Sequence, residues 1–194
     1  MHTLVFATNN PHKLEEIQAI VPGYIHIISL KAAGIEIDIP EPHATLEANA
    51  TEKSATIFRL TGKDCFSEDT GLEVVSLNGE PGVQSARYAG EPPDPEKNME
   101  KLLQRLAGKT DRRARFRTVI SLILAGKEFF FEGICAGTIA DAPAGNNGFG
   151  YDPVFIPDGA ARSFGNMTMN EKKAFSHRRK ATDQLIAFLQ TLDQ

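Results

Sequence analysis

The stretch LVFATNNPHKLEEIQAIV (residues 4–21) joins a short apolar run to an amphipathic segment through a polar turn. The apolar run at its start is typical of a buried strand. Asn9 or Asn10 can cap a helix that starts at Pro11, because the missing N–H of proline costs nothing at the first helical position. Apolar residues then recur at helical spacing, at Leu14, Ile17 and Val21. The stretch therefore predicts a strand, a tight polar turn and a helix.

Strand and helix signals alternate along the rest of the chain. The further expected elements are a strand at 25–28, a helix from about Thr45 to Leu60 closed by Gly62, strands at 64–67 and 72–75, a helix opened by Asp94 and Pro95, a hairpin within 113–139, a short strand at 154–156 and a final helix carrying Ala181 to Leu192. This order mixes parallel crossovers with antiparallel hairpins. It predicts an α/β fold with a mixed sheet, as one domain over residues 1–194 or as two closely associated lobes.

The composition excludes several classes of protein. Of 194 residues, 41% are hydrophobic and 24% are charged, which is ordinary for a globular domain. The net charge of −4 argues against a DNA-coating or membrane-surface protein, which normally carries a basic excess. The apolar runs are too short to span a membrane, and the N-terminus does not read as a signal peptide. Cys65 and Cys135 form no CxxC motif, so we expect reduced core thiols in a cytoplasmic protein.

The turn from Thr8 to Lys13 is a candidate phosphate site. Exposed N–H groups at a helix N-terminus, the helix dipole and a lysine in the first turn all suit phosphate oxygens. An ordinary capped turn that binds nothing is the alternative interpretation.

Acidic residues form a second candidate site. Glu68 and Asp69 are neighbours in an extended segment at a strand end, so they point to opposite faces and only one can face a given cleft. Glu41 lies between two prolines that hold its backbone stiffly. Carboxylates of this kind suit Mg²⁺, which takes one or two of them with substrate phosphates and water. Solvated surface acids are the alternative.

Lys53 lies on the apolar face of the helix expected from Thr45. The apolar stripe that includes it consists of Leu46, Ala50, Ile57 and Leu60. A lysine in this position either extends its ammonium group to water or meets an anion.

Two further segments suggest a nucleotide ligand. The glycine-rich loop from Gly145 to Pro153 allows close backbone approach, and Phe149 and Tyr151 offer rings on which a base could stack. A tight loop with core aromatics is equally consistent with that pattern. Residues 172–180 hold six basic or potentially basic side chains, which suit a polyanionic ligand or a solvated helix face.

Five motifs occur in order along the chain. They are Thr8-Asn9-Asn10 with Lys13, SEDTGL (67–72), Pro81-Gly82-Val83 with Ser85-Ala86-Arg87-Tyr88, GFGYDP (148–153) and Ser176-His177-Arg178. Together they resemble the motifs of the inosine/xanthosine triphosphate pyrophosphatases, the Ham1-like family, over nearly the whole chain. Asn9 departs from a common glycine, and Ala48 stands where many members have an acid.

The resemblance implies Mg²⁺-dependent hydrolysis of ITP, dITP and XTP to the monophosphate and pyrophosphate, which keeps deaminated purines out of DNA and RNA. It implies an elongated mixed β-sheet flanked by helices, with two lobes around a central nucleotide-binding cleft. It further implies a homodimer. The composition and charge lead us to expect a cytoplasmic protein that needs no nucleic-acid or membrane partner.

The resemblance also assigns roles to residues. Asp69 is the expected proton acceptor and a metal ligand, with Glu41 as a second metal ligand. His177 and Arg178 are expected to contact the purine. The expected triphosphate-binding residues are Thr8, Asn9, Asn10, Pro11, His12 and Lys13. The other expected nucleotide contacts are Lys53, Thr70, Phe149, Gly150, Tyr151, Asp152 and Lys172.

Two other functions fit part of the pattern. A Maf-like pyrophosphatase would run the same reaction on other modified nucleotides. A non-catalytic nucleotide sensor would keep the lysines and the glycine-rich loop but could dispense with Asp69 and Glu41. The presence of both acids favours the enzyme.

Overall fold

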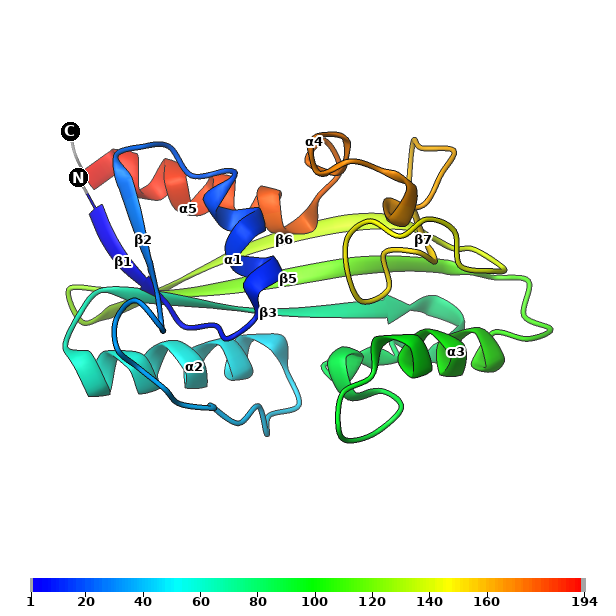
Figure 1. Cartoon of the computed structure of the whole chain (residues 1–194), viewed down its shortest axis with the longest axis horizontal. Coiled ribbons are helices and arrows are strands. Elements are labelled where there is room, and N and C mark those ends of the chain that lie inside the picture. Colours follow the sequence, from blue (N-terminus) through cyan, green and yellow to red (C-terminus); the bar gives the residue numbers. More distant parts are fainter. Residues whose placement is uncertain (1, 193–194) are drawn as a thin grey trace. The chain divides into compact units, whose positions relative to one another are not determined.

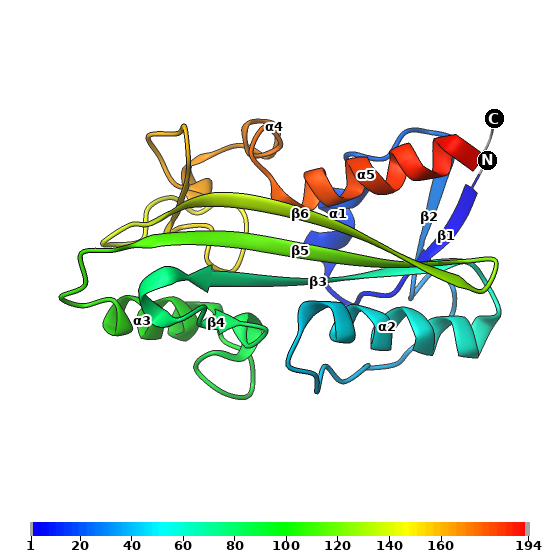
Figure 2. The same cartoon turned by 180° about the vertical axis from the view of Figure 1, so that it is seen from behind.

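The computed structural model describes residues 2–192, which form a mixed sheet flanked by helices (Figures 1 and 2). The sheet has the strand order β2-β1-β3-β5-β6-β7, with β4 paired to β3. The strands are β1 (His2–Phe6), β2 (Ile25–Ser29), β3 (Cys65–Val74), β4 (Pro81–Gly82), β5 (Arg113–Leu124), β6 (Lys127–Ile139) and β7 (Phe155–Pro157). The α-helices are α1 (Pro11–Gln18), α2 (Leu46–Thr61), α3 (Pro95–Arg105), α4 (Met169–Lys172) and α5 (His177–Leu192). The sheet is mixed because β1 pairs in parallel with β2 and β3, whereas β3–β4 and β6–β7 are antiparallel. The predicted α/β class is confirmed.

The chain divides into two compact units, of which the first comprises residues 2–69, 118–133 and 178–192. Alternation along its strands separates two cores. Leu4 and Phe6 of β1 pack with residues of α1 and α5, whereas Val5 of β1 packs with Ile57 of α2. Helices α1 and α5 therefore cover one face of this unit's strands and α2 covers the other (Figure 1).

The second unit comprises residues 70–117 and 134–177 and has its own core. Leu102 of α3 packs there with Leu72 of β3, Phe116 of β5 and Phe155 of β7. The predicted arrangement of two lobes around a nucleotide cleft stays a prediction.

Most predicted elements are confirmed, and several helix ends lie where they were expected, although α1 ends at Gln18, before Val21. Asn10 caps α1 and Pro11 is its first residue. Thr45 caps α2, which ends at Gly62 in the left-handed conformation, and Asp94 caps α3. The predicted hairpin is β5 and β6. Among residues 2–192, no helix is long and apolar enough to cross a membrane.

Two expectations about strands and helix faces are wrong. The strands expected at 64–67 and 72–75 are one continuous strand, β3, so Asp69 lies within a strand and not at its end. The polar residues between them do not interrupt the strand because their charges are paired inside the protein. Leu60, expected on the buried stripe of α2, is 59% exposed because it lies in the last turn of the helix, past the sheet contact of Ile57.

Candidate active site

The turn between β1 and α1 is organised by the Asn10 side chain. Asn10 Oδ1 accepts hydrogen bonds from the backbone N–H groups of His12 (3.0 Å) and Lys13 (3.3 Å). Thr8 Oγ1 accepts one from the backbone N–H of Asn10 (3.1 Å). Pro11 occupies the first helical position, where it needs no hydrogen-bond partner. The turn therefore fixes Lys13 in the first turn of α1, beside the positive end of the helix dipole.

Glu68 lies at the centre of a buried charge network on the α1 and α5 side of β3. Arg178 donates two parallel hydrogen bonds to its carboxylate, from Nε at 2.7 Å and from Nη2 at 2.8 Å. Lys13 Nζ lies 3.1 Å from the same carboxylate, and Arg178 Nη1 also donates to Glu16. Burial would raise the pKa of Glu68, but Arg178 and Lys13 outweigh that effect and hold it well below the ordinary value. Glu68 is therefore a fixed anion that anchors two cations.

Asp69 lies in a different environment on the α2 side of β3. Asp69 is buried, with 6% of the residue exposed. Its carboxylate lies 3.5 Å from Lys53 Nζ and accepts a hydrogen bond from Asn49 Nδ2 (3.3 Å). Glu41 also pairs with the Lys53 ammonium group. Burial raises the pKa of Asp69, and the charge of Glu41 adds to this, while Lys53, Lys13 and Asn49 oppose it. Asp69 is thus a better proton acceptor than an ordinary aspartate.

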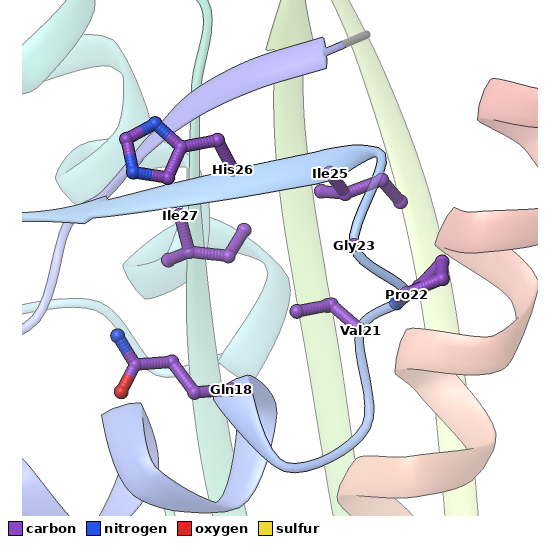
Figure 3. A pocket seen from close by; sticks show the side chains of 7 residues that line it. All are labelled: Gln18, Val21, Pro22, Gly23, Ile25, His26 and Ile27. Atoms are coloured by element: carbon purple, nitrogen blue, oxygen red, sulfur yellow. The ribbon is translucent and has the colours of Figure 1, made fainter.

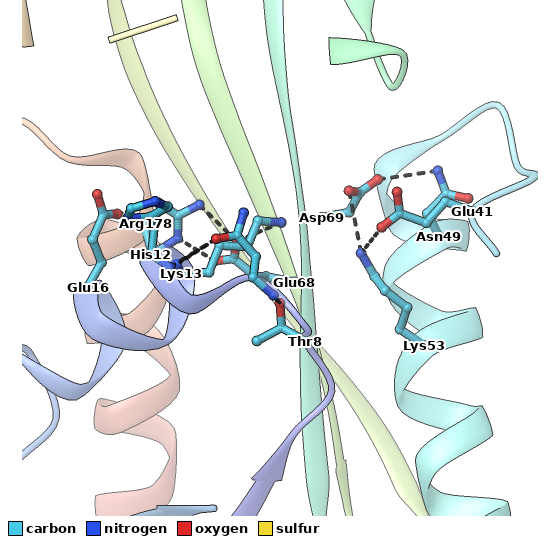
Figure 4. Close-up of polar contacts among 11 residues, drawn as sticks. Thr8, His12, Lys13, Glu16, Glu41, Asn49, Lys53, Glu68, Asp69 and Arg178 are labelled. Carbon is cyan, nitrogen blue, oxygen red and sulfur yellow. Dashed lines mark hydrogen bonds and ion pairs between the residues drawn. The ribbon is translucent and has the colours of Figure 1, made fainter. Parts of the chain in front are cut away.

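The two carboxylates leave β3 in opposite directions because side chains alternate along a strand (Figure 4). This confirms the expectation that only one of them can face a given site. Lys53 is buried on the apolar face of α2 and meets anions there, as one of the two predictions for it required.

The glycine-rich loop of the second unit is organised by Asp152. Its Oδ2 accepts hydrogen bonds from the backbone N–H of Phe149 (2.9 Å) and from Lys172 Nζ (2.7 Å). The Lys172 ammonium group also lies 5.2 Å from the centre of the Phe149 ring. Gly148 has a positive φ, and a Cβ at that position would collide with the Asp152 carboxylate. Asp152 and Lys172 therefore hold Phe149 in place; a direct contact of Lys172 with a nucleotide stays a prediction.

Other predicted contacts in the second unit are also placed. Tyr151 is a buried core residue whose hydroxyl donates to the backbone carbonyl of Ser85 (2.8 Å). His177 is buried and stacks on Phe116, with ring centres 4.7 Å apart. Gly150 has a positive φ, and Thr70 follows Asp69 in β3.

The predicted site residues thus divide between the two units. The first-unit group contains the turn from Thr8 to Lys13 with Glu41, Lys53, Asp69 and Arg178. The second-unit group contains Thr70, residues 149–152, Lys172 and His177.

Three residues at the first-unit group were missed from the sequence. Glu68 was noted only as the neighbour of Asp69, and its two cationic partners lie 55 and 110 residues away in the chain. Glu16 is one of two adjacent acids on α1, and no periodicity distinguishes it. Asn49 lies four residues before Lys53 and hence on the same helix face, which is the signal that could have identified it.

The carboxylates of Asp69 and Glu41 fit a Mg²⁺ ion. Among residues 2–192, no cluster of three or more His, Cys, Asp or Glu side chains is arranged to hold a metal. However, Asp69 and Glu41 converge on a single ammonium group, that of Lys53, so their oxygens already gather round one positive charge. Two carboxylates are the donor set that Mg²⁺ takes when substrate phosphates and water complete its shell.

A hollow at the edge of the first unit is separate from these residues (Figure 3). Its lining comes from the end of α1 and the edge strand β2: Gln18, Val21, Pro22, Gly23, Ile25, His26 and Ile27. No predicted site residue lines it.

Comparison with known proteins assigns a family. Residues 4–188 match the family model described as Ham1 family. The chain belongs to the Ham1 family. The dITP/XTP pyrophosphatase of Porphyromonas gingivalis is 50% identical over 190 residues, which cover 97% of this chain and 98% of that protein. The dITP/XTP pyrophosphatase of Flavobacterium psychrophilum is 50% identical over 185 residues, which cover 95% and 97%.

Solved structures of other Ham1 proteins are similar over the same length. The Ham1 protein of Staphylococcus aureus has a TM-score of 0.88 and 40% identity, covering 97% of this chain and 98% of that one. The HAM1 protein of Coxiella burnetii has a TM-score of 0.90 and 34% identity, covering 98% and 100%.

Neutralising each of the two adjacent carboxylates of this Ham1 chain should have different effects on stability. At pH 7, Glu68→Gln should lower the free energy of unfolding by about 3–5 kcal/mol, because Arg178 and Lys13 lose a buried anion. Asp69→Asn should leave stability unchanged or raise it, because the folded protein disfavours ionised Asp69. Denaturant unfolding of both variants checks this.

The pH dependence of the Glu68 effect follows from its lowered pKa. The stabilisation is present above the unfolded pKa and is lost as the pH falls through the folded one. The difference in the free energy of unfolding between wild type and Glu68→Gln should therefore become smaller below about pH 4.5. Equal destabilisation by both variants at pH 7 would contradict the assignment.

Proposed function

We propose that this protein is a nucleoside triphosphate pyrophosphatase that hydrolyses dITP, XTP and ITP to the monophosphate and pyrophosphate. Relatives of known name that are 42–50% identical over nearly the whole chain are dITP/XTP pyrophosphatases. The observation that carries the proposal is the pairing of Asp69, a buried carboxylate of raised pKa, with the cation Lys53. A non-catalytic nucleotide-binding protein has no need of such a proton acceptor.

The proposed reaction is attack of water on the α-phosphorus. Asp69 orients the water and accepts its proton as the new oxygen–phosphorus bond forms. The α–β phosphoanhydride bond breaks and pyrophosphate leaves with the electron pair. A positioned base of this kind typically contributes about 10²–10⁴-fold to the rate.

Cationic side chains bind the substrate in this proposal. A triphosphate carries several negative charges, and Lys13 and Lys53 supply positive charge in a protein whose net charge is −4. Mg²⁺ bound by Asp69 and Glu41 would neutralise phosphate charge and polarise the phosphoryl group. Glu68 keeps Lys13 at the N-terminal end of α1, so that the lysine presents its charge from a fixed position.

Selectivity is proposed to come from the 6-oxo group of the purine. Hypoxanthine and xanthine present an acceptor there, whereas adenine presents a donor. A site whose donors, from His177, Arg178 or a backbone N–H, face that position would leave them unpaired with adenine. Such a mismatch can reduce kcat/KM by about 10⁴-fold.

In the cell, we propose a cytoplasmic homodimer that removes deaminated purine nucleotides without a nucleic-acid or membrane partner.

A nucleotide panel tests the activity directly. With Mg²⁺, pyrophosphate release from ITP, dITP and XTP should exceed that from ATP, GTP and pyrimidine triphosphates. Asp69→Asn should lower turnover by about 10²–10⁴-fold with the fold retained. Asp183→Asn, which removes a surface carboxylate paired with Arg179 along the same helix, serves as control. Preference for pyrimidine nucleotides would indicate a Maf-like enzyme, and full activity of Asp69→Asn would remove Asp69 from the mechanism.

The pH profile tests the environment of Asp69. Ionised Asp69 is required, so kcat/KM should fall as the pH drops through its raised pKa. Because the Lys53 ammonium group opposes that rise, Lys53→Met should raise the pKa further and move the acid limb to higher pH. Lys31→Met removes the same charge from an exposed position and should leave the limb in place. An acid limb that moves to lower pH in Lys53→Met would refute the assignment.

A further inference from the structure

The connection between β2 and α2 contains an extended segment, residues 35–43, which we call the strap. The strap forms no strand, although its side chains alternate as in one. Ile35, Ile37 and Ile39 are half-buried against the core beneath α2, while Glu36 and Asp38 between them are exposed. Its apolar residues therefore fix which face of the strap is buried, but backbone pairing with the sheet does not fix its position.

The first polar anchor of the strap is Asn9. Its Nδ2 donates a 2.8 Å hydrogen bond to the backbone carbonyl of Ile37, 28 residues along the chain. Asn9 belongs to the turn between β1 and α1, whose shape is set by Thr8 and Asn10. The side chain of Asn9 is thus directed to the strap, and its role in triphosphate binding stays a prediction.

The second anchor is Asn49, which is buried on α2. Its Oδ1 accepts from the backbone N–H of His43 (2.9 Å) and its Nδ2 donates to the His43 carbonyl (3.2 Å). The same Nδ2 lies 3.3 Å from Asp69 Oδ2. One amide therefore joins the end of the strap to the candidate catalytic carboxylate.

Glu41 lies between the two anchored residues, Ile37 and His43. Pro40 and Pro42 on either side of it have fixed φ angles, which removes freedom from the backbone that carries Glu41. Its carboxylate reaches Lys53, the cation that Asp69 also faces. The position of Glu41 thus depends on where Ile37 and His43 are held.

We propose that the amides of Asn9 and Asn49 are positioning residues that hold the strap so that Glu41 faces Lys53 and Asp69. The consequence for catalysis rests on the proposed function; the consequence for the strap does not. Asn9 gives the cleaner test because its amide binds the strap at Ile37, whereas the amide of Asn49 also contacts Asp69. Its φ is not positive, so alanine adds no backbone strain there.

The first experiment measures the strap alone, without metal or nucleotide. Glu36 is exposed, so the bond after it is a candidate site for a glutamyl endopeptidase. Because Ile37 is half-buried, cleavage needs the strap to leave its place. Loss of one neutral hydrogen bond should make cleavage in Asn9→Ala about two- to tenfold faster. Asn9→Asp, which replaces the donor with an acceptor of nearly the same size, should speed cleavage at least as much as Asn9→Ala does.

The control for this experiment is Asn147→Ala, which removes an exposed amide from the second unit and should leave cleavage at Glu36 unchanged. An unchanged cleavage rate in both Asn9 variants would overturn the proposal.

The second experiment is a double-mutant cycle on kcat/KM for ITP with Mg²⁺. If Asn9 acts through Glu41, Asn9→Ala should lower kcat/KM about two- to tenfold in the wild-type background and have no further effect in Glu41→Gln. The same loss in both backgrounds would mean that Asn9 contacts the triphosphate directly, and would overturn the proposal. A wild-type protein inactive on every nucleotide refutes the proposed function instead, and the cleavage rates still decide the role of Asn9.

Discussion

The alternation of side chains along β3 puts two neighbouring carboxylates into opposite electrostatic environments. Glu68 faces α1 and α5, where Arg178 and Lys13 surround it. Asp69 faces α2, where a single lysine is shared with a second acid, Glu41. For Glu68 the lowering of the pKa by cations exceeds the raising by burial, whereas for Asp69 the raising by burial exceeds the lowering by cations. One strand therefore supplies both a permanent anion that anchors the site and a carboxylate that can take up a proton.

The Glu68 network also explains how distant segments are joined. Its members come from α1, β3 and the first turn of α5, so one buried carboxylate connects the N-terminal turn with the last helix. A cation in the first turn of a helix is opposed by the helix dipole. Arg178 is tolerated there because Glu68 and Glu16 supply the compensating charge. We therefore read Arg178 as structural support for the turn that carries Lys13, whatever contact it makes with a base.

Local signals in the sequence were enough for the longer helices and for the points at which α1, α2 and α3 begin, but not for the short helix α4. Asn10, Thr45 and Asp94 cap helices because their short polar side chains reach free backbone N–H groups, and this depends only on neighbours in the chain. An anionic partner for Lys53 was one of two predictions, since a charge on an apolar helix face reaches either water or an anion. Family resemblance located Asp69 and Glu41, but not what surrounds them.

The continuous course of β3 and the roles of Glu68 and Asn49 could not be predicted in the same way. A run such as Ser67-Glu68-Asp69-Thr70-Gly71 looks like a turn because its polarity is normally a sign of exposure. Here the partners that allow burial lie far away in the sequence, Arg178 on α5 and Lys53 on α2. Asn49 shows the same limit, because its importance comes from two contacts at once, with the strap and with Asp69.

The difference between the two carboxylates can be measured directly by ¹³C NMR titration of the side-chain carboxyl groups, in protein free of metal and nucleotide. The pKa of Glu68 should lie below its ordinary value of 4.5 and that of Asp69 above its ordinary value of 3.8. The usual order of glutamate and aspartate would then be inverted at adjacent positions of one strand. Ordinary pKa values for both groups, in the ordinary order, would contradict the division of charge across β3 on which the site depends.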